Sequence, residues 1–225
     1  MSLVWELGRV GYNKAYELQR KLHRQRIMEE IPDVLLLLEH PPTITVGKSG
    51  KIENILVPPE ELRERGVSVF FIDRGGDVTY HGPGQIVGYP IMDLKARGKD
   101  IRRFVHDIEE VLIRTVGDFG IAAGRDETHP GVWVEGRELA AIGLAVRRWV
   151  SMHGFALNVH PDMAHFGLIN PCGFTDRKAV SMAELVGEGI GIEDVRRCLM
   201  GHFETVFGAS IEETSDKSKA LGGNP

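Results

Sequence analysis

The sequence feature that most restricts the fold is a glycine-rich segment placed between two apolar runs. Residues 74–85 read RGGDVTYHGPGQ and contain four glycines and one proline. The preceding run, VSVFFID, and the following run, IVGYPIMDL, are rich in the β-branched and aromatic residues that favour strands. Because glycine allows backbone N–H groups to approach a ligand closely, the segment predicts a binding loop between two strands, although a glycine-rich hairpin would have the same composition.

Two common phosphate-binding motifs are missing from the sequence. The glycine-rich segment lacks the GxGxxG spacing, and GKS at 47–49 lacks the first glycine of a P-loop, where Pro42 stands. Three histidines near predicted strand ends, His40, His81 and His153, do not have the spacing of metal ligands. We therefore expect neither phosphate binding by these motifs nor a metal site.

Hydrophobic periodicity predicts the other elements. Apolar residues recur at helical spacing from the candidate cap Asn13 to residue 31, after the cap Asp100, and again near the C-terminus. Strands are predicted for VLLLLEH, TITVG, GVWVE and the long stretch ELAAIGLAVRRWVSMHGFALNV. Two prolines between VLLLLEH and TITVG predict a rigid turn there.

Length and charge limit the domain organisation and the partners. A chain of 225 residues that is 42% hydrophobic can bury one large core, so we expect a single domain over residues 1–212 and a mobile polar tail over 213–225. The net charge of −5, with scattered basic residues, argues against nucleic acid. The longest apolar run, VLLLL, is too short to cross a bilayer, and two cysteines without CxxC are typical of a reducing compartment. We therefore expect a cytoplasmic protein without a membrane partner.

Cys172 is the candidate nucleophile. It stands between Pro171 and Gly173 in GLINPCGF, a stretch without helical or strand periodicity. A thiol reacts as its thiolate, and a cysteine with a pKa of about 8.5 is mostly protonated at neutral pH, so Cys172 needs an activating neighbour. The other cysteine, Cys198, adjoins an apolar helical stripe and is expected to be a small buried hydrophobic residue.

Six strings, in order along most of the chain, resemble the lipoyl(octanoyl) transferases of lipoate biosynthesis. They are EHPP, RGGDVTYHGPGQ, GVWV, AAIG, HGFALNV and INPCGF. The resemblance implies an α/β fold with a mixed β-sheet flanked by helices, like the catalytic domain of biotin and lipoate protein ligases. It also implies that an octanoyl group passes from acyl carrier protein to a lysine of a lipoyl domain, without ATP, a metal or another cofactor. The implied acceptors are the lipoyl domains of 2-oxoacid dehydrogenase complexes and the glycine cleavage H protein.

The resemblance also assigns roles to individual residues. Cys172 matches the nucleophile that accepts the acyl group before the acceptor lysine takes it. Other matched residues imply an acyl pocket with backbone N–H groups near the thioester oxygen, where small residues such as Gly143 and Gly154 leave room for an eight-carbon tail. The implied pocket residues are Arg74, Gly75, Gly76, Asp77, Val78, Thr79, Tyr80, His81, Ala141, Ile142, Gly143, His153, Gly154, Phe155 and Ala156.

One position departs from the family pattern. The family has a lysine directly before a strand of the form LAAIG, where this sequence has Glu138. An ammonium group would stabilise the Cys172 thiolate, whereas a carboxylate would raise the pKa of the thiol. In an unbroken strand Glu138 shares the face of Ile142, Leu144 and Val146; a solvated position at the strand end is the alternative. Other candidate activators are Arg137, His81 and His153.

Two other functions fit part of the sequence. An ATP-dependent lipoate or biotin protein ligase has a similar glycine-rich segment, but it does not need Cys172 and uses a catalytic lysine that Glu138 replaces. A non-catalytic protein that holds the acylated carrier or a lipoyl domain is favoured by Glu138 alone. Pyrophosphate release would identify a ligase, and the lack of a covalent acyl adduct would identify a binding protein.

Overall fold

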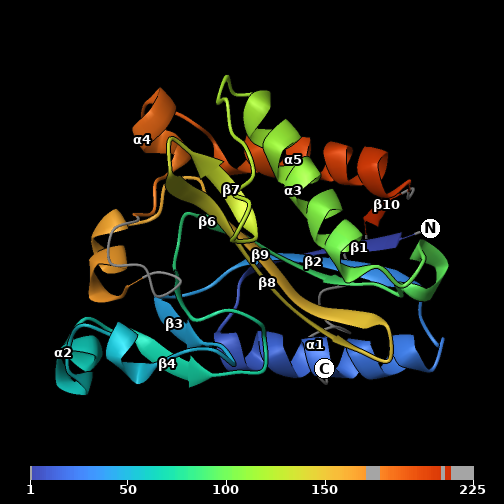
Figure 1. Cartoon of the computed structure of the whole chain (residues 1–225), viewed down its shortest axis with the longest axis horizontal. Helices are drawn as coiled ribbons and strands as arrows, with labels where there is room; N and C mark the ends of the chain where they lie inside the picture. Colours follow the sequence, from blue (N-terminus) through green and yellow to red (C-terminus); the bar gives the residue numbers. More distant parts are fainter. Residues whose placement is uncertain (1, 171–177, 209–210, 214–225) are drawn as a thin grey trace, which may run out of the picture.

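The computed structural model describes residues 2–170, 178–208 and 211–213, and its largest element is a seven-stranded mixed sheet with helices on both faces (Figure 1). The strand order is β10-β1-β2-β6-β9-β8-β7. β10 and β2 run parallel to β1, and the other neighbours are antiparallel. The bounds are β1 Ser2–Arg9, β2 Asp33–Glu39, β6 Gln85–Ile91, β7 Gly131–Val134, β8 Arg137–Arg147, β9 Val150–Asn158 and β10 Ile211–Glu213. The predicted class, a mixed α/β fold with a sheet flanked by helices, is confirmed.

A second, three-stranded sheet lies beside the first. β3, Thr43–Val46, pairs in parallel with β4, Ser68–Phe71, and antiparallel with β5, Val78–His81. The predicted turn at the two prolines is present, and it carries the chain from β2 of the large sheet to β3 of the small one. The glycine-rich segment therefore begins beside the small sheet and ends, through β5 and β6, in the large one.

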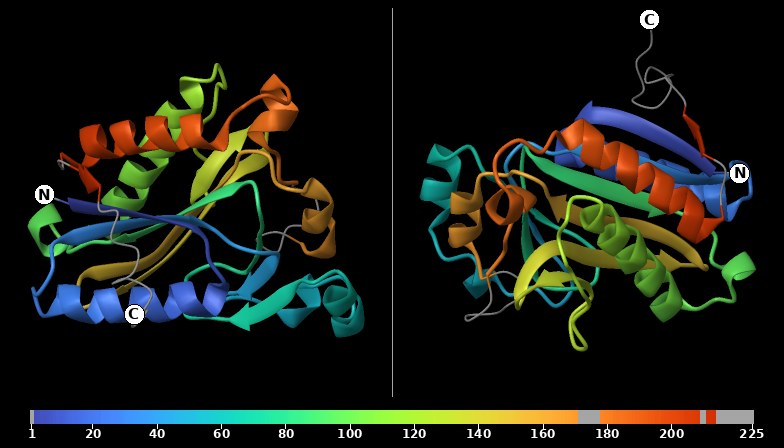
Figure 2. Two further views of the ribbon diagram at one scale, coloured as in Figure 1. Left: turned by 180° about the vertical axis from the view of Figure 1, so that it is seen from behind. Right: turned by 90° about the horizontal axis from the view of Figure 1, so that it is seen from above.

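Helices cover both faces of the large sheet (Figure 2). α1, Tyr12–Ile27, lies on one face, and α3, Ile101–Gly117, and α5, Ile192–Phe207, lie side by side on the other. Along β2, the odd-numbered leucines at 35 and 37 pack with α3 and α5, while those at 36 and 38 pack with α1. Burial on both faces explains why this strand is an unbroken apolar run.

The predicted helix limits agree with the structure only in part. Asp100 caps α3 by accepting a hydrogen bond from the backbone N–H of Arg103, as predicted. The N-cap of α1 is Gly11, without a side-chain hydrogen bond, so the prediction of Asn13 as the cap is wrong. α1 also ends at Ile27 rather than at residue 31. The remaining helices are α2 Pro59–Glu64, α4 Met182–Val186 and the short 3-10 helices η1 Ile52–Asn54, η2 Lys95–Arg97 and η3 Met163–Leu168.

Two strands at one edge of the large sheet, β1 and β10, have no counterpart in the sequence-based prediction. β1 contributes Val4 to the core under α3 and α5, and Leu3 and Trp5 pack toward α1. β10 runs parallel to β1, and Glu213 is paired with Val4. The ordered sheet thus continues one residue into the predicted tail, and residues 214–225 lie outside the described part of the chain.

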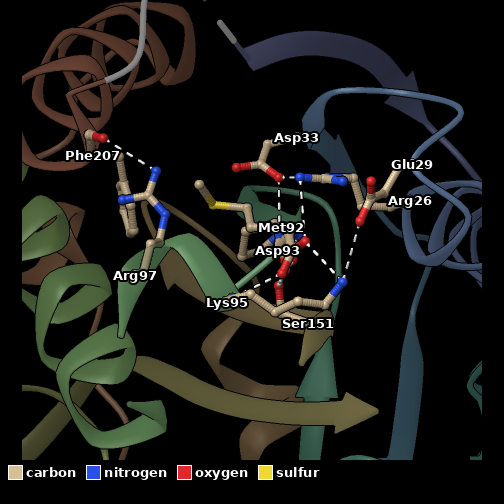
Figure 3. Close-up of polar contacts among 10 residues, drawn as sticks. Arg26, Glu29, Asp33, Met92, Asp93, Lys95, Arg97, Ser151 and Phe207 are labelled. Carbon is tan, nitrogen blue, oxygen red and sulfur yellow. Dashed lines mark hydrogen bonds and ion pairs between the residues drawn. The ribbon is translucent and has the colours of Figure 1, made fainter. Parts of the chain in front are cut away.

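A polar network fixes the C-terminal end of α1 to the sheet, at the opposite end of the helix from Tyr12 (Figure 3). Arg26 Nε donates to Asp33 Oδ1 at 2.8 Å, and Arg26 Nη2 lies 3.7 Å from Asp93 Oδ2. Lys95 Nζ adds a contact of 3.5 Å to the same Asp93 carboxylate. Because Asp33 starts β2 and Asp93 follows β6, α1 is held in a defined position across two central strands.

Candidate active site

A cavity lies where the large sheet, the small sheet and the start of α1 meet. β8 and β9 contribute one side, and β5 with the loop before it contributes another. The unfilled space, including its open mouth, is about 490 Å³. The lining residues are Tyr12, Arg74, Gly76, Asp77, Val78, Thr79, His81, Tyr89, Ala141, Ile142, Gly143, His153, Gly154, Phe155 and Ala156.

All but two of the residues implied as the acyl pocket line this cavity. One exception is Gly75, whose N–H donates to the carbonyl oxygen of Leu144 at 2.9 Å. The other is Tyr80, which points away from the cavity because neighbouring residues of β5 face opposite sides. Its ring stacks on His165 with a centroid distance of 5.2 Å, and its hydroxyl lies 3.1 Å from His165 Nδ1.

Arg74 holds the glycine-rich loop in shape. Its guanidinium donates to the carbonyl oxygens of Thr45 at 2.8 Å, of Gly75 at 2.9 Å and of Asp77 at 2.8 Å. It also donates to the Thr45 hydroxyl at 3.0 Å. A planar guanidinium with several donors can bind many carbonyl groups at once, so Arg74 connects β3 to the loop that follows β4.

Two tyrosines that no motif indicated, Tyr12 and Tyr89, join two buried histidines at the cavity. His40 Nδ1 donates to the carbonyl oxygen of Val10 at 2.6 Å, so Nε2 is the acceptor for the Tyr89 hydroxyl at 2.8 Å. The Tyr12 ring stacks on His81 with a centroid distance of 6.3 Å. Burial lowers the pKa of His40 to about 4 and the pKa of His81 well below its ordinary value. The only sequence signal for Tyr89 was a hydroxyl within an apolar strand, which usually has a buried partner.

The low pKa of His40 predicts a loss of stability in mild acid. The unfolded chain binds a proton at His40 near pH 6.5, whereas the folded chain does so only near pH 4, so this contribution to stability is complete above pH 6.5 and declines as the pH falls. Between pH 7.5 and pH 5, His40 alone should cost about 2 kcal/mol of unfolding free energy. In His40→Asn, which retains a donor for Val10, urea titrations should show a pH dependence smaller by that amount. The same pH dependence of the unfolding free energy in the unmodified protein and in His40→Asn would contradict the prediction.

The glycines at 143 and 154 are required by protein packing. A Cβ on Gly154 would lie 2.0 Å from the carbonyl oxygen of Gly88 in β6. A Cβ on Gly143 would lie 3.0 Å from both Arg74 Cδ and the carbonyl oxygen of Gly75. Neighbouring protein atoms thus occupy the place that side chains at these positions would take, and because both glycines line the cavity, the expectation that they leave room for an acyl tail stays a prediction.

Glu138 lies at an irregular point of β8. Val132 of β7 is opposite Ala140, but the next residue, Trp133, is opposite Glu138, so Leu139 has no partner and forms a β-bulge. Leu139 and Ala140 are consecutive, yet both belong to the core cluster under α3 and α5. The strand is thus not regular between Glu138 and the residues that follow.

The bulge reverses the face that Glu138 was expected to take. Because Leu139 faces the core, Glu138 points to the opposite face, which is that of Ala141 at the cavity. The expected face, shared with Ile142, Leu144 and Val146, is therefore wrong. Glu138 is only 5% exposed, so it is not a solvated strand end either.

The other candidate activators of the cysteine already have partners. Arg137 Nη2 lies 3.5 Å from a Glu135 carboxylate oxygen at the surface, and His153 Nε2 lies 2.9 Å from Asp73 Oδ1. His81 is uncharged at neutral pH because burial lowers its pKa. Neutral His81 cannot supply the positive charge that stabilises a thiolate.

Cys172 lies outside the described residues, but both ends of the segment 171–177 are attached near the cavity. Before it, the Asn170 N–H donates to the carbonyl oxygen of Asn54 at 2.8 Å, and Asn54 Nδ2 donates to Asp77 Oδ2 at 2.7 Å. After it, the carbonyl oxygen of Lys178 accepts from the Glu138 N–H at 2.9 Å. The chain therefore enters the segment beside Asp77, a lining residue, and leaves it at the start of β8.

The described residues offer little for a metal or a membrane. Nowhere in the described ranges do three His, Cys, Asp or Glu side chains come together as metal ligands would. No described helix is both long and apolar enough to cross a membrane.

Cys198 of α5 is only partly buried, whereas the sequence predicted a buried residue. Burial and the neighbouring Asp118 carboxylate raise the pKa of its thiol.

Comparison with known proteins decides the family. A family model described as the lipoyl protein ligase A/B catalytic domain matches residues 11–204. The chain belongs to this family. Within it, the chain is 52% identical over 210 residues to an octanoyltransferase of Caldicellulosiruptor saccharolyticus, covering 92% of this chain and 89% of the relative. It is 46% identical over 215 residues to an octanoyltransferase of Desulforamulus reducens, covering 95% and 94%. This member of the family is an acyltransferase, as the sequence motifs predict.

Solved structures of more distant proteins confirm the fold. A putative lipoate protein ligase of Thermoplasma acidophilum superposes with a TM-score of 0.74 at 16% identity, covering 98% of this chain and 92% of that one. A biotin protein ligase of Aquifex aeolicus gives a TM-score of 0.53 at 10% identity, covering 99% and 73%. At these identities the likeness concerns the fold alone.

Proposed function

We propose that the protein transfers an octanoyl group from acyl carrier protein to a lysine of a lipoyl domain, through an acyl-thioester on Cys172. The observation that carries the proposal is the 52% identity, over nearly the whole chain, to a protein named octanoyltransferase. The acceptors that fit are lipoyl domains of 2-oxoacid dehydrogenase complexes and the glycine cleavage H protein, and the compartment that fits a chain with two cysteines and no CxxC motif is the cytoplasm.

The chemistry divides into two acyl transfers. In the first, the Cys172 thiolate attacks the carbonyl carbon of the octanoyl thioester, and the carrier thiolate leaves with a proton from the solvent or a neighbouring acid. In the second, the acceptor amine attacks the new thioester, loses a proton, and releases the Cys172 thiolate. The first step exchanges one thioester for another, and the second forms a more stable amide, so neither step needs ATP.

The cavity suits the acyl part of this substrate. The side chains of Ala141 and Ala156 lie on the cavity face of β8 and β9, and Val78, Ile142 and Phe155 belong to its lining although their side chains pack into the neighbouring cores. β5 is the edge strand of the small sheet within the described residues, so some of its N–H groups face away from β3. Such donors could stabilise the oxyanion that forms when the thioester carbonyl is attacked.

Glu138 suggests that this chain is slower than one with lysine at the same position. Its backbone is bonded to the chain that leaves the cysteine segment, and its side chain is buried on the cavity face. A buried carboxylate near Cys172 would raise the pKa of the thiol and reduce the thiolate fraction at neutral pH. The proposed reaction still proceeds through the minor thiolate form.

Acylation of Cys172 is the expected result when the protein is mixed with octanoyl-acyl carrier protein. Intact-mass measurement should show the gain of one octanoyl group, and peptide mapping should place it on the peptide with Cys172. Cys198→Ser is the matched control and should retain the adduct, whereas Cys172→Ser should lose it. An adduct that persists in Cys172→Ser would contradict the mechanism. Pyrophosphate release with octanoate, ATP and magnesium, without a cysteine adduct, would instead support an ATP-dependent ligase.

A further inference from the structure

Two hollows follow one another on the same face of β8 and β9. Gly143 and Gly154, which are paired, line the cavity described above. Ala145 and Met152, which are also paired and lie two residues further along each strand, line a second hollow. Residues two apart share one face of a strand, so the hollows are neighbours along the strand pair. The second hollow is lined by Tyr16, Arg20, His23, Arg24, Asp73, Ala145, Arg147 and Met152.

His153 separates the two hollows because its backbone is unusual. It is paired with Leu144, which packs toward α3 and α5, and directly opposite residues normally share a face. However, His153 has a φ of 60°, in the left-handed region that L-residues rarely adopt. Its ring lies on the cavity face instead, and its N–H donates to Gln19 Oε1 of α1 at 2.9 Å.

Three side chains form a partition between the hollows. His153 Nε2 lies 2.9 Å from Asp73 Oδ1, and the Tyr16 hydroxyl donates to the same oxygen at 3.0 Å. The rings of Tyr16 and His153 stack with a centroid distance of 5.6 Å. The His153 side chain is 2% exposed and that of Asp73 is 52% exposed, so the partition has a buried side and a solvent side. We call Tyr16, Asp73 and His153 the end wall.

The end wall lies at the far end of the cavity from Lys178, the first described residue after the cysteine segment. The carbonyl oxygen of Lys178 accepts a hydrogen bond from the Glu138 N–H at the start of β8. Along β8 the order is then Ala141 and Gly143 at the cavity, followed by Ala145 at the second hollow. An acyl chain whose carbonyl carbon is near Glu138 therefore directs its methyl end toward His153.

The second hollow is unsuited to hydrocarbon. Its lining includes Arg20, Arg24 and Arg147, which have no ion-pair partner among the described residues. Placing a methyl end there would remove water from charged groups without replacing their hydrogen bonds, which is unfavourable. Once an acyl chain reaches the end wall, further carbons therefore do not increase its binding affinity.

We propose that Tyr16, Asp73 and His153 form the end of the acyl-binding site and set the longest acyl chain that it accepts. This inference rests on the proposed function for the identity of the ligand, an unbranched acyl group. Up to the end wall, each buried methylene should increase affinity by roughly fourfold. Removal of the end wall should extend that increase to longer chains.

Equilibrium binding of straight-chain primary alkanamides tests the end wall without requiring transfer. Calorimetric titration of the whole chain with amides of six to twelve carbons should show affinity rising to about eight carbons and then levelling off. In Tyr16→Ala the rise should continue, with decanamide binding roughly tenfold tighter than it binds the unmodified protein. His153→Gly should behave likewise, because glycine adopts a positive φ without strain. Tyr16→Phe retains the ring and should retain the limit.

The outcomes distinguish the end wall from the proposed function. An unchanged length limit in both Tyr16→Ala and His153→Gly, with folding verified by circular dichroism, would overturn the inference. Affinity that keeps rising in the unmodified protein, or no amide binding at all, would overturn it as well. A shifted limit together with no acyl adduct on Cys172 would retain the end wall and reject the proposed function.

Discussion

Glu138→Lys is expected to accelerate octanoyl transfer by roughly 10² to 10⁴, the usual contribution of a positioned acid–base group. Glu138 is buried on the cavity face, and its N–H is bonded to the residue that follows the cysteine segment. An ammonium group there would stabilise the Cys172 thiolate, protonate the departing carrier thiol and accept a proton from the incoming amine. Single-turnover transfer from octanoyl-acyl carrier protein to a lipoyl domain measures the effect.

The thiol itself provides a second measurement. In Glu138→Lys, the pH at which Cys172 reacts with iodoacetamide should fall, because the ammonium lowers the pKa of the thiol. Glu135→Lys is the matched control, since it makes the same change of charge three positions away on a side chain that is 82% exposed. Glu135→Lys should change neither the rate of octanoyl transfer nor the pH at which Cys172 reacts with iodoacetamide. If rate and pH profile are unchanged in Glu138→Lys, the carboxylate does not act on the cysteine.

Gly154→Ala is expected to reduce the free energy of unfolding by about 3 kcal/mol or more, at or above the upper end of the range for overpacked cores. The added Cβ would lie 2.0 Å from the carbonyl oxygen of Gly88 and 2.7 Å from Pro90 Cδ. Both neighbours belong to β6, a central strand between β2 and β9, so neither can move without disturbing the sheet. Urea unfolding at neutral pH measures the loss.

The same substitution at an uncrowded glycine separates crowding from backbone effects. A Cβ on Gly124 would have no atom within 4 Å, so Gly124→Ala should change stability by less than about 0.5 kcal/mol. Equal losses in the two variants would show that the contact with β6 is not the cause. A stable Gly154→Ala would show that β6 can move away from β9.

The sequence correctly predicts those strands that can be identified from their amino-acid composition alone. VLLLL is buried between helices on both faces, so its apolar character is unbroken and easily recognised. β10, in contrast, has the sequence IEE and is only three residues long, so no composition signal marks it. Nor does composition reveal that β3 to β5 form a separate sheet, because partner choice depends on contacts distant in sequence.

The sequence likewise predicts only part of the candidate site. Motif resemblance located most of the residues that line the cavity, including Arg74 and His81 of the glycine-rich segment. It could not predict the face of Glu138, since the bulge at Leu139 arises from the register between β7 and β8. The orientation of the His153 ring likewise depends on a positive φ in the middle of a strand. The presence of a histidine in the sequence does not predict a positive φ. Local sequence specifies the residue types, and the pairing of strands specifies where they point.

The position of β1 between β2 and β10 affects how the protein folds during synthesis. Ser2 is aligned with Asp33 on one side and with Ile211 on the other. The first partner emerges from the ribosome early, but the second emerges only after nearly all the other strands. Throughout that time one edge of β1 has no strand to pair with, and unpaired edges promote association between chains. Pairing with β10 then covers the edge of β1 at Ser2–Val4, which removes that part of the edge as a site for association between nascent copies.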